Sequence, residues 1–108
     1  MKEREYLGNF ETMVLLSLLR LGEDAYGVPI TNEIEKQSGR PVAVGSVYAA
    51  LERLERKGLI TSRWGDATPE RGGRAKKHFC VTASGLKELR HTQKTLVNLW
   101  KGVPELKG

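Results

Sequence analysis

The sequence predicts a mainly α-helical fold with one two-stranded β-hairpin, and three observations lead to this prediction. Apolar residues recur at helical spacing in three segments of the first half of the chain, residues 9–20, 26–38 and 45–57. Two short β-type segments, residues 59–64 and 77–82, then flank a glycine-rich basic loop. A fourth amphipathic segment, residues 83–102, follows the second strand. Three helices, a hairpin and a last helix are the parts of a winged helix-turn-helix with a C-terminal dimerisation helix. The hairpin and its loop would be the wing.

The first helix, expected at residues 9–20, is unusually apolar. Asn9 is placed to cap its N-terminus, and Glu11 lies in its opening turn. Apolar positions lie nearly all round it: Met13, Val14, Leu15, Leu16, Leu18, Leu19 and Leu21. Such a helix is buried on most sides, either in the core of the domain or partly against another subunit.

The second and third helices each have one apolar face. In the second helix Tyr26, Ile30 and Ile34 share a face, and Gly39 is predicted to end the helix. In the third helix the spacing predicts a buried stripe at Val44, Val47, Leu51 and Leu54. The opposite face then carries Ser46, Ala49, Ala50, Arg53 and Lys57.

The last helix carries a seam of apolar residues at heptad spacing. Thr82 is expected to cap this helix. Leu86 and Leu89 can pack on the domain formed by residues 1–82. A domain of this size offers little further apolar surface to pack against the outer residues of the seam. We therefore predict that residues 83–108 belong to the same compact unit and also form a symmetric homodimer interface. The predicted interface residues are Leu89, Gln93, Leu96, Trp100 and Val103. The alternative is a helix that folds back on its own core.

The distribution of charge indicates a polyanionic partner. The net charge is +5, but residues 1–60 hold eight Lys or Arg against nine Asp or Glu, whereas residues 61–108 hold ten against four. In a helix-turn-helix, the N-terminal residues of the later helix contact base edges in the major groove of DNA. The predicted DNA contacts on the third helix are Gly45, Ser46, Ala49 and Arg53. The alternative is an ordinary amphipathic helix with a solvated polar side.

The loop of the predicted wing would add contacts to the DNA backbone. Its glycines, Gly72 and Gly73, let the chain approach a phosphate closely. The predicted cationic contacts are Arg71, Arg74, Lys76 and Lys77. A nucleotide-binding loop is disfavoured because a strand, not a helix N-terminus, follows these glycines.

Other functional classes find little support in the residues. No nucleophile or carboxylate pair has an arrangement typical of an enzyme. His78 and Cys80 share a strand face, but a metal site would need two further ligands, so we expect no metal or other cofactor. Cys80 is interpreted as a core or half-buried residue, and Trp64 as a packing anchor of the wing. The single cysteine and the absence of a bilayer-spanning apolar run predict a cytoplasmic protein without membrane contacts.

Four stretches of the chain resemble the PadR-like family of bacterial transcriptional regulators across roughly residues 7–100. They read LGNFETMVLLSLL, AYGVPITNEIE, GSVYAALERLERKGLI and GGRAKKHFCVTASG. The resemblance implies a winged-helix dimer that binds operator DNA, usually as a repressor, with the C-terminal helix at the dimer interface. It also implies that Tyr48 contacts a phosphate. Ala49 departs from the family pattern, in which many members have proline. The chain looks like the short subgroup, some of which bind hydrophobic compounds between subunits.

These observations together predict a transcriptional regulator, a repressor, that binds a pseudo-palindromic operator as a homodimer. One alternative is a winged-helix module that binds another protein, although such modules usually lack a cationic wing. The other is a repressor whose dimer interface senses a small hydrophobic effector.

Overall fold

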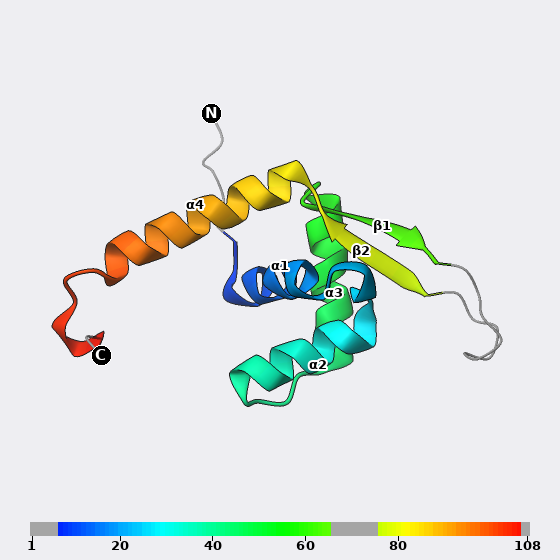
Figure 1. Cartoon of the computed structure of the whole chain (residues 1–108), viewed down its shortest axis with the longest axis horizontal. Helices are drawn as coiled ribbons and strands as arrows, with labels where there is room; N and C mark the ends of the chain where they lie inside the picture. The colour runs from blue at the N-terminus through cyan, green and yellow to red at the C-terminus, as the bar shows by residue number, and fades with distance from the viewer. Residues whose placement is uncertain (1–6, 66–75, 107–108) are drawn as a thin grey trace.

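The computed structural model describes residues 7–65 and 76–106, and it places three packed helices between a hairpin and a projecting helix (Figure 1). The helices are α1 (Asn9–Leu21), α2 (Gly27–Ser38), α3 (Val44–Arg56) and α4 (Ala83–Trp100). Short 3₁₀ turns follow α1 (Gly22–Asp24) and α4 (Pro104–Leu106). Strands β1 (Ile60–Trp64) and β2 (Lys77–Val81) pair antiparallel, with Ile60 opposite Val81 and Trp64 opposite Lys77. The predicted fold class is confirmed.

The hydrophobic core lies where α1, α2, α3 and the hairpin meet. Each element contributes side chains that are almost completely removed from solvent: Val14, Leu15, Ile30, Val47, Ala50, Leu51, Leu54 and Ile60. Burial of one such aliphatic side chain contributes about 2 kcal/mol. The face predicted for α2 is buried at Ile30 and Ile34, whereas Tyr26 is only half-buried.

The start and the outer side of α1 differ from the prediction. Gly8, not Asn9, occupies the N-cap position, and its N–H donates to Glu11 Oε1 at 3.2 Å. A carboxylate in the third helical position can close the first turn in this way, so no cap from Asn9 is needed. Met13, Leu16 and Leu19 are between 39% and 48% exposed, because the other elements cover only the opposite side of the helix.

The buried stripe of α3 also needs one correction. Val44 is 46% exposed, whereas Ala50, which the pattern assigned to the polar side, is fully buried. Ala50 lies three residues after Val47 and four before Leu54, so helical geometry places it on the core side. Val44 is the first residue of the helix, where neighbouring elements no longer cover that face.

The start of α4 is fixed to the base of the wing. Thr82 accepts a hydrogen bond from the Gly85 N–H at 3.1 Å, as predicted for a cap. Its hydroxyl donates to the Gly58 carbonyl at 2.8 Å, and its N–H donates to the Leu59 carbonyl at 3.0 Å. Gly85 packs so closely on the Leu59 carbonyl that a side chain there would overlap with it. The direction of the helix is therefore set at its first turn.

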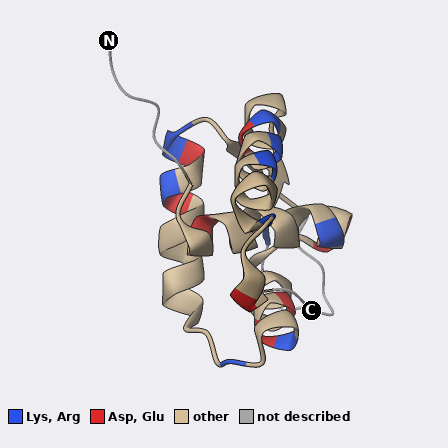
Figure 2. Ribbon diagram, turned by 90° about the vertical axis from the view of Figure 1, so that its left-hand side faces the viewer, with Lys and Arg blue, Asp and Glu red and all other residues tan. Residues whose placement is uncertain are grey.

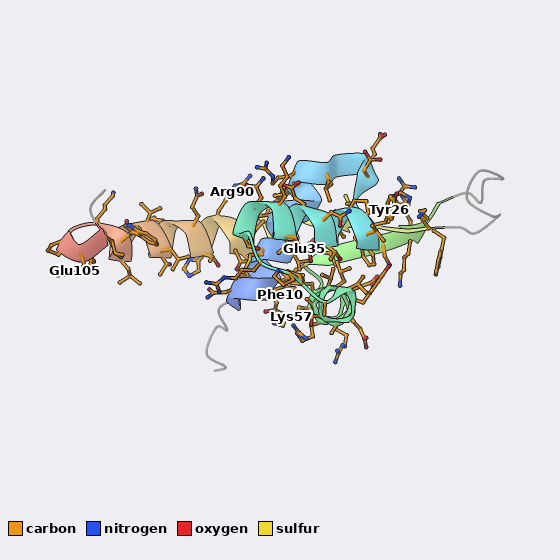
Figure 3. The ribbon with its side chains drawn as sticks, turned by 90° about the horizontal axis from the view of Figure 1, so that it is seen from below. Phe10, Tyr26, Glu35, Lys57, Arg90 and Glu105 are labelled. Atoms are coloured by element: carbon orange, nitrogen blue, oxygen red, sulfur yellow. The ribbon has the colours of Figure 1, made fainter. Side chains whose placement is uncertain are left out.

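The outer half of α4 projects away from the domain, on the side opposite to the hairpin (Figure 1). Leu89 is 7% exposed and belongs to the chain's own core, which corrects its assignment to a dimer interface. Leu96, Leu99 and Trp100 are 50–69% exposed, so the outer half does not fold back on the domain. Figure 3 shows the far end of α4 extending past the other elements. The helix ends at Trp100 rather than residue 102, and Val103 lies in the following turn.

Candidate nucleic-acid interface

The N-terminal half of α3 presents a smooth, uncharged surface. Gly45, Ser46 and Ala49 are exposed, and their side chains are among the smallest available. The charged residues of α3 gather at its C-terminal end, as the helix at the left of Figure 2 shows. A helix with small side chains lets its backbone come close to a partner surface. This half of α3 therefore has the shape required to enter a groove of DNA.

Tyr48 connects this surface to the N-terminus of α2. Its side chain is 48% exposed, and its hydroxyl lies against Gly27, the first residue of α2. Any side chain at position 27 would overlap with the tyrosine ring, so glycine is required for this contact. The N-terminus of a helix carries unpaired N–H groups and a partial positive charge. Tyr48 is thus placed where a phosphate would be favoured.

The base of the wing is attached to the segment between α1 and α2. The ammonium of Lys76 lies 4.4 Å from the centroid of the Tyr26 ring, and the His78 ring makes an edge contact with Tyr26 at 5.4 Å. His78 Nδ1 is 2.9 Å from the Glu23 carbonyl oxygen, and the Phe79 N–H donates to the Ala25 carbonyl at 2.9 Å. The N-terminus of α2 therefore contacts Tyr48 of α3 through Gly27, and Lys76 of the wing base through its N-cap residue Tyr26.

Two of the four predicted wing cations can be located. Lys76 and Lys77 lie at the start of β2, whereas Arg71 and Arg74 lie outside the described residues. Trp64 is 68% exposed, so the prediction that it packs as an anchor is wrong. It stands at the far end of β1, beyond the helices that cover the sheet, with the Lys77 ammonium 5.9 Å from its ring centroid.

Cys80 is exposed as well, contrary to its interpretation as a core or half-buried residue. It alternates with the buried Phe79 along β2, and only the face that carries Phe79 packs on the helices. Within the described ranges, no group of three or more His, Cys, Asp or Glu side chains could hold a metal ion. In the same residues, no helix is long and apolar enough to cross a bilayer.

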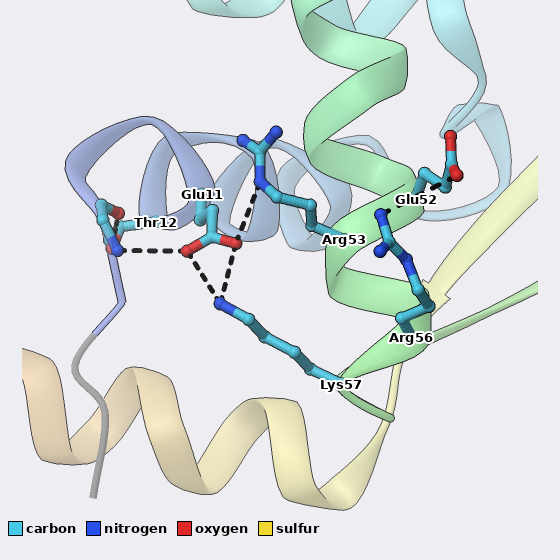
Figure 4. Close-up of polar contacts among 7 residues, drawn as sticks. Glu11, Thr12, Glu52, Arg53, Arg56 and Lys57 are labelled. Carbon is cyan, nitrogen blue, oxygen red and sulfur yellow. Dashed lines mark hydrogen bonds and ion pairs between the residues drawn. The ribbon is translucent and has the colours of Figure 1, made fainter.

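The cations at the C-terminal half of α3 divide into two groups. Arg53 and Lys57 turn toward Glu11 of α1, with Arg53 Nε 3.6 Å and Lys57 Nζ 3.0 Å from Oε2 of the carboxylate (Figure 4). Arg56 points away from α1, is 70% exposed and, within the part of the chain that the structure describes, forms an ion pair with Glu52, one helical turn earlier. An exposed pair of this kind contributes little. Gly45, Ala49, Glu52 and Arg56 follow 4-3-4 spacing and form the outermost stripe of α3. Gly45 and Ala49 are predicted contacts, whereas Glu52 and Arg56 are not among them.

The environment of Glu11 determines its charge. Burial alone would raise the pKa of this carboxyl group, but several contacts have the opposite effect. Hydrogen bonds from Lys57 and from the Gly8 N–H, with the positive charges of Lys57 and Arg53, hold its pKa below the usual value near 4.5. Glu11 is therefore an anion at neutral pH, and it neutralises part of the positive charge of α3.

A groove of about 540 Å³ runs beside the smooth surface of α3. Ser46, Ala49 and Arg53 form its α3 side, and Phe10 and Arg40 lie among the residues that line the remainder. The predicted contacts Ser46, Ala49 and Arg53 are thus brought together at one concave surface.

A helix-turn-helix followed by a hairpin that is anchored beside its second helix defines a winged-helix protein. The chain belongs to the Transcriptional regulator PadR-like family, whose family model matches residues 15–91. This confirms the family that the sequence resembles. The described structure and this match together identify the protein as a PadR-like transcriptional regulator.

Solved structures of family members share the fold over most of the chain. A PadR family regulator from Clostridium difficile R20291 is 25% identical, with a TM-score of 0.73, and the match covers 93% of this chain and all of that one. A PadR family regulator from Eggerthella lenta is 32% identical, with a TM-score of 0.69 over 88% of this chain and 80% of that one. Bacillus subtilis PadR, solved in complex with operator DNA, is 28% identical with a TM-score of 0.64, and the match covers 79% of this chain and 48% of that one.

Proposed function

We propose that this regulator binds duplex operator DNA as a homodimer and represses transcription. One observation carries the proposal: the exposed, uncharged N-terminal half of α3 is linked to Lys76 at the base of the wing through Gly27 and the N-cap residue Tyr26 of α2. A recognition helix with a cationic element beside it can contact base edges and the phosphate backbone together. The operator complex of the Bacillus subtilis relative supports the same assignment.

Each part of this surface has a role in the proposed complex. Gly45, Ser46 and Ala49 would lie against base edges, and Tyr48 would contact a phosphate beside the N-terminus of α2. Arg53 lines the adjoining groove, and Arg56 adds an outward cation that reaches either a guanine or a phosphate. The wing cations Arg71, Arg74, Lys76 and Lys77 would bind the backbone.

The homodimer part of the proposal rests on the apolar surface that the domain leaves uncovered. Leu96 and Trp100 on the outer half of α4 are at least half exposed. Leu16 and Leu19 of α1 are also exposed, and they line an apolar groove together with Leu96. A two-fold axis through this region would cover both sets and present two recognition helices to a pseudo-palindromic site. The outer positions proposed for the interface are Gln93, Leu96 and Trp100, with Val103 adjoining them. The repressor role is carried over from the family resemblance.

The wing provides the first test. In the variant Arg74→Ala/Lys76→Ala/Lys77→Ala, affinity for every duplex should fall, and the slope of log affinity against log salt should become shallower by about 2–3 per protomer. Fluorescence anisotropy with labelled duplexes over a salt series measures both quantities. A matched control removes three other exposed cations, Lys87 and Lys94 of α4 and Lys101 directly after it, and should leave the slope nearly unchanged. Equal slopes for wild type and the wing variant would refute the wing contacts.

Selection of preferred sites from a random duplex pool tests sequence specificity and symmetry together. We expect a pseudo-palindrome whose half-sites are centred about 10 bp apart. Purified protein that fails to bind any duplex at low ionic strength would refute DNA binding and favour a protein-interaction module instead.

A second function, the sensing of a small hydrophobic effector at the dimer interface, is favoured by the apolar grooves between α1 and α4. One groove of about 670 Å³ is lined by side chains that include Leu7, Met13, Leu96 and Leu99. Trp100 is exposed on the same half of α4 and would report occupancy. In a Trp64→Phe variant, planar aromatic compounds should quench the remaining tryptophan fluorescence with saturation. Linear quenching without saturation would argue against a site.

A further inference from the structure

Glu11 is a buried anion that joins α1 to the C-terminal half of the recognition helix. The residue is 7% exposed, and one of its oxygens accepts the Gly8 N–H. Both oxygens accept hydrogen bonds from Lys57 Nζ, at 3.0 and 3.3 Å, and Oε2 lies 3.6 Å from Arg53 Nε (Figure 4). A single carboxylate therefore holds two cations of α3 against α1.

Those two cations also remain partly exposed to solvent. The side chains of Arg53 and Lys57 are 46% and 38% exposed, and they are four residues apart on one side of α3. Arg53 also lines the groove that contains Ser46 and Ala49. Unrestrained cations at this position would bind phosphates of any sequence, because phosphate contacts carry no sequence information.

We propose that Glu11 is a specificity-determining residue that acts through Arg53 and Lys57. This inference rests on the proposed DNA-binding function. By neutralising and holding both cations, Glu11 limits contacts with the backbone of non-operator DNA. Discrimination between operator and non-operator DNA then depends on the small side chains in the N-terminal half of α3. Glu11 is a positioning residue, since it need not contact DNA itself.

The direct test is Glu11→Gln. Glutamine keeps an oxygen for the Gly8 N–H, so the first turn of α1 retains its cap, but the charge that holds the two cations is lost. Affinity for random duplex should rise about tenfold at 0.1 M salt, and the salt slope should steepen by about 1–2 per protomer. The ratio of affinities for the selected operator and for random duplex should fall.

The control for net charge is Glu33→Gln. Glu33 also forms an ion pair with α1, at 2.7 Å from Arg20 Nε, but it lies on α2, where its carboxylate also accepts a hydrogen bond from Gln37. Both variants change the net charge by one, so a general charge effect would appear equally in both. We expect the change in slope and in affinity ratio only with Glu11→Gln.

A comparison of two neighbouring cations keeps the proposal testable if Glu11→Gln does not fold. Arg56→Gln should make the salt slope on random duplex shallower by about 1, since this cation is exposed and free of Glu11. Lys57→Gln should change the salt slope by less than about half of the change expected for Arg56→Gln, because Glu11 already neutralises Lys57.

Three outcomes would overturn the inference. If Glu11→Gln lowers the affinity for operator and for random duplex equally and leaves the salt slope unchanged, the role of Glu11 is structural only. A larger effect of Lys57→Gln than of Arg56→Gln would show that Lys57 contacts DNA despite Glu11. Wild-type protein that binds no duplex would refute the proposed function itself, whereas failure of the variants alone refutes only the role of Glu11.

Discussion

The two halves of α4 have the same apolar spacing but lie in different surroundings. Leu89 in the inner half is 7% exposed and packs in the domain core, whereas Leu96 and Trp100 in the outer half are 50% and 60% exposed. The inner half is attached through Thr82 and Gly85 to the base of the wing. The outer half continues past the edge of the domain, where no other element of the described chain covers it (Figures 1 and 3).

The two halves of α4 are therefore expected to differ in function: the inner half contributes to folding, and the outer half to assembly. Burial stabilises apolar side chains whichever chain packs against them. The spacing of apolar residues along a helix is therefore the same for an intramolecular contact and for a dimer interface. The inner residues should therefore govern the stability of a single chain. The outer residues should govern association, and three sets of substitutions test this division.

The largest effect on stability is expected from Leu89→Ala. The change removes a buried side chain from the core and should lower the free energy of unfolding by about 2–4 kcal/mol. Urea unfolding followed by circular dichroism measures this loss. The matched outer change, Leu99→Ala, should cost less than about 0.5 kcal/mol in protein dilute enough to be monomeric. Equal losses at the two positions would show that the outer half is also part of the folded core.

The next effect concerns association. The variant Leu96→Ala/Trp100→Ala should weaken the proposed homodimer by at least about 2 kcal/mol, or about 30-fold in Kd, while the monomer keeps its helical content. Sedimentation equilibrium against concentration measures the shift. A dimer of undiminished affinity would assign the interface to another surface, with the exposed leucines of α1 as the next candidate.

The smallest effect is expected at the junction that directs α4. Thr82→Ala removes the cap of the helix and the hydrogen bond to the Gly58 carbonyl, and should lower the free energy of unfolding by about 1 kcal/mol. Ser84→Ala, at an exposed position in the same first turn, is the control and should have almost no effect. If Thr82→Ala lowered the free energy of unfolding as much as Leu89→Ala, the junction would contribute more to stability than a helix cap.

Much of the candidate interface could be predicted from the sequence. Gly45, Ser46 and Ala49 are exposed on α3 as predicted, because helical periodicity fixes which residues oppose the buried stripe. Arg56 could have been found by the same reasoning, since it continues the outermost stripe. The exposure of Trp64 and Cys80 could not be predicted, because burial on a two-stranded sheet depends on how far the covering helices extend.

The sequence by itself determined the order of the elements, their boundaries to within one or two residues and most of the core, because caps, turns and periodicity act between near neighbours. Only the tertiary structure decided that Glu11 meets Lys57, 46 residues further along the chain, and that α4 passes beyond its own domain. Such contacts depend on the angles at which distant helices pack. Those angles are set by the shape of the whole core, and no local pattern records them.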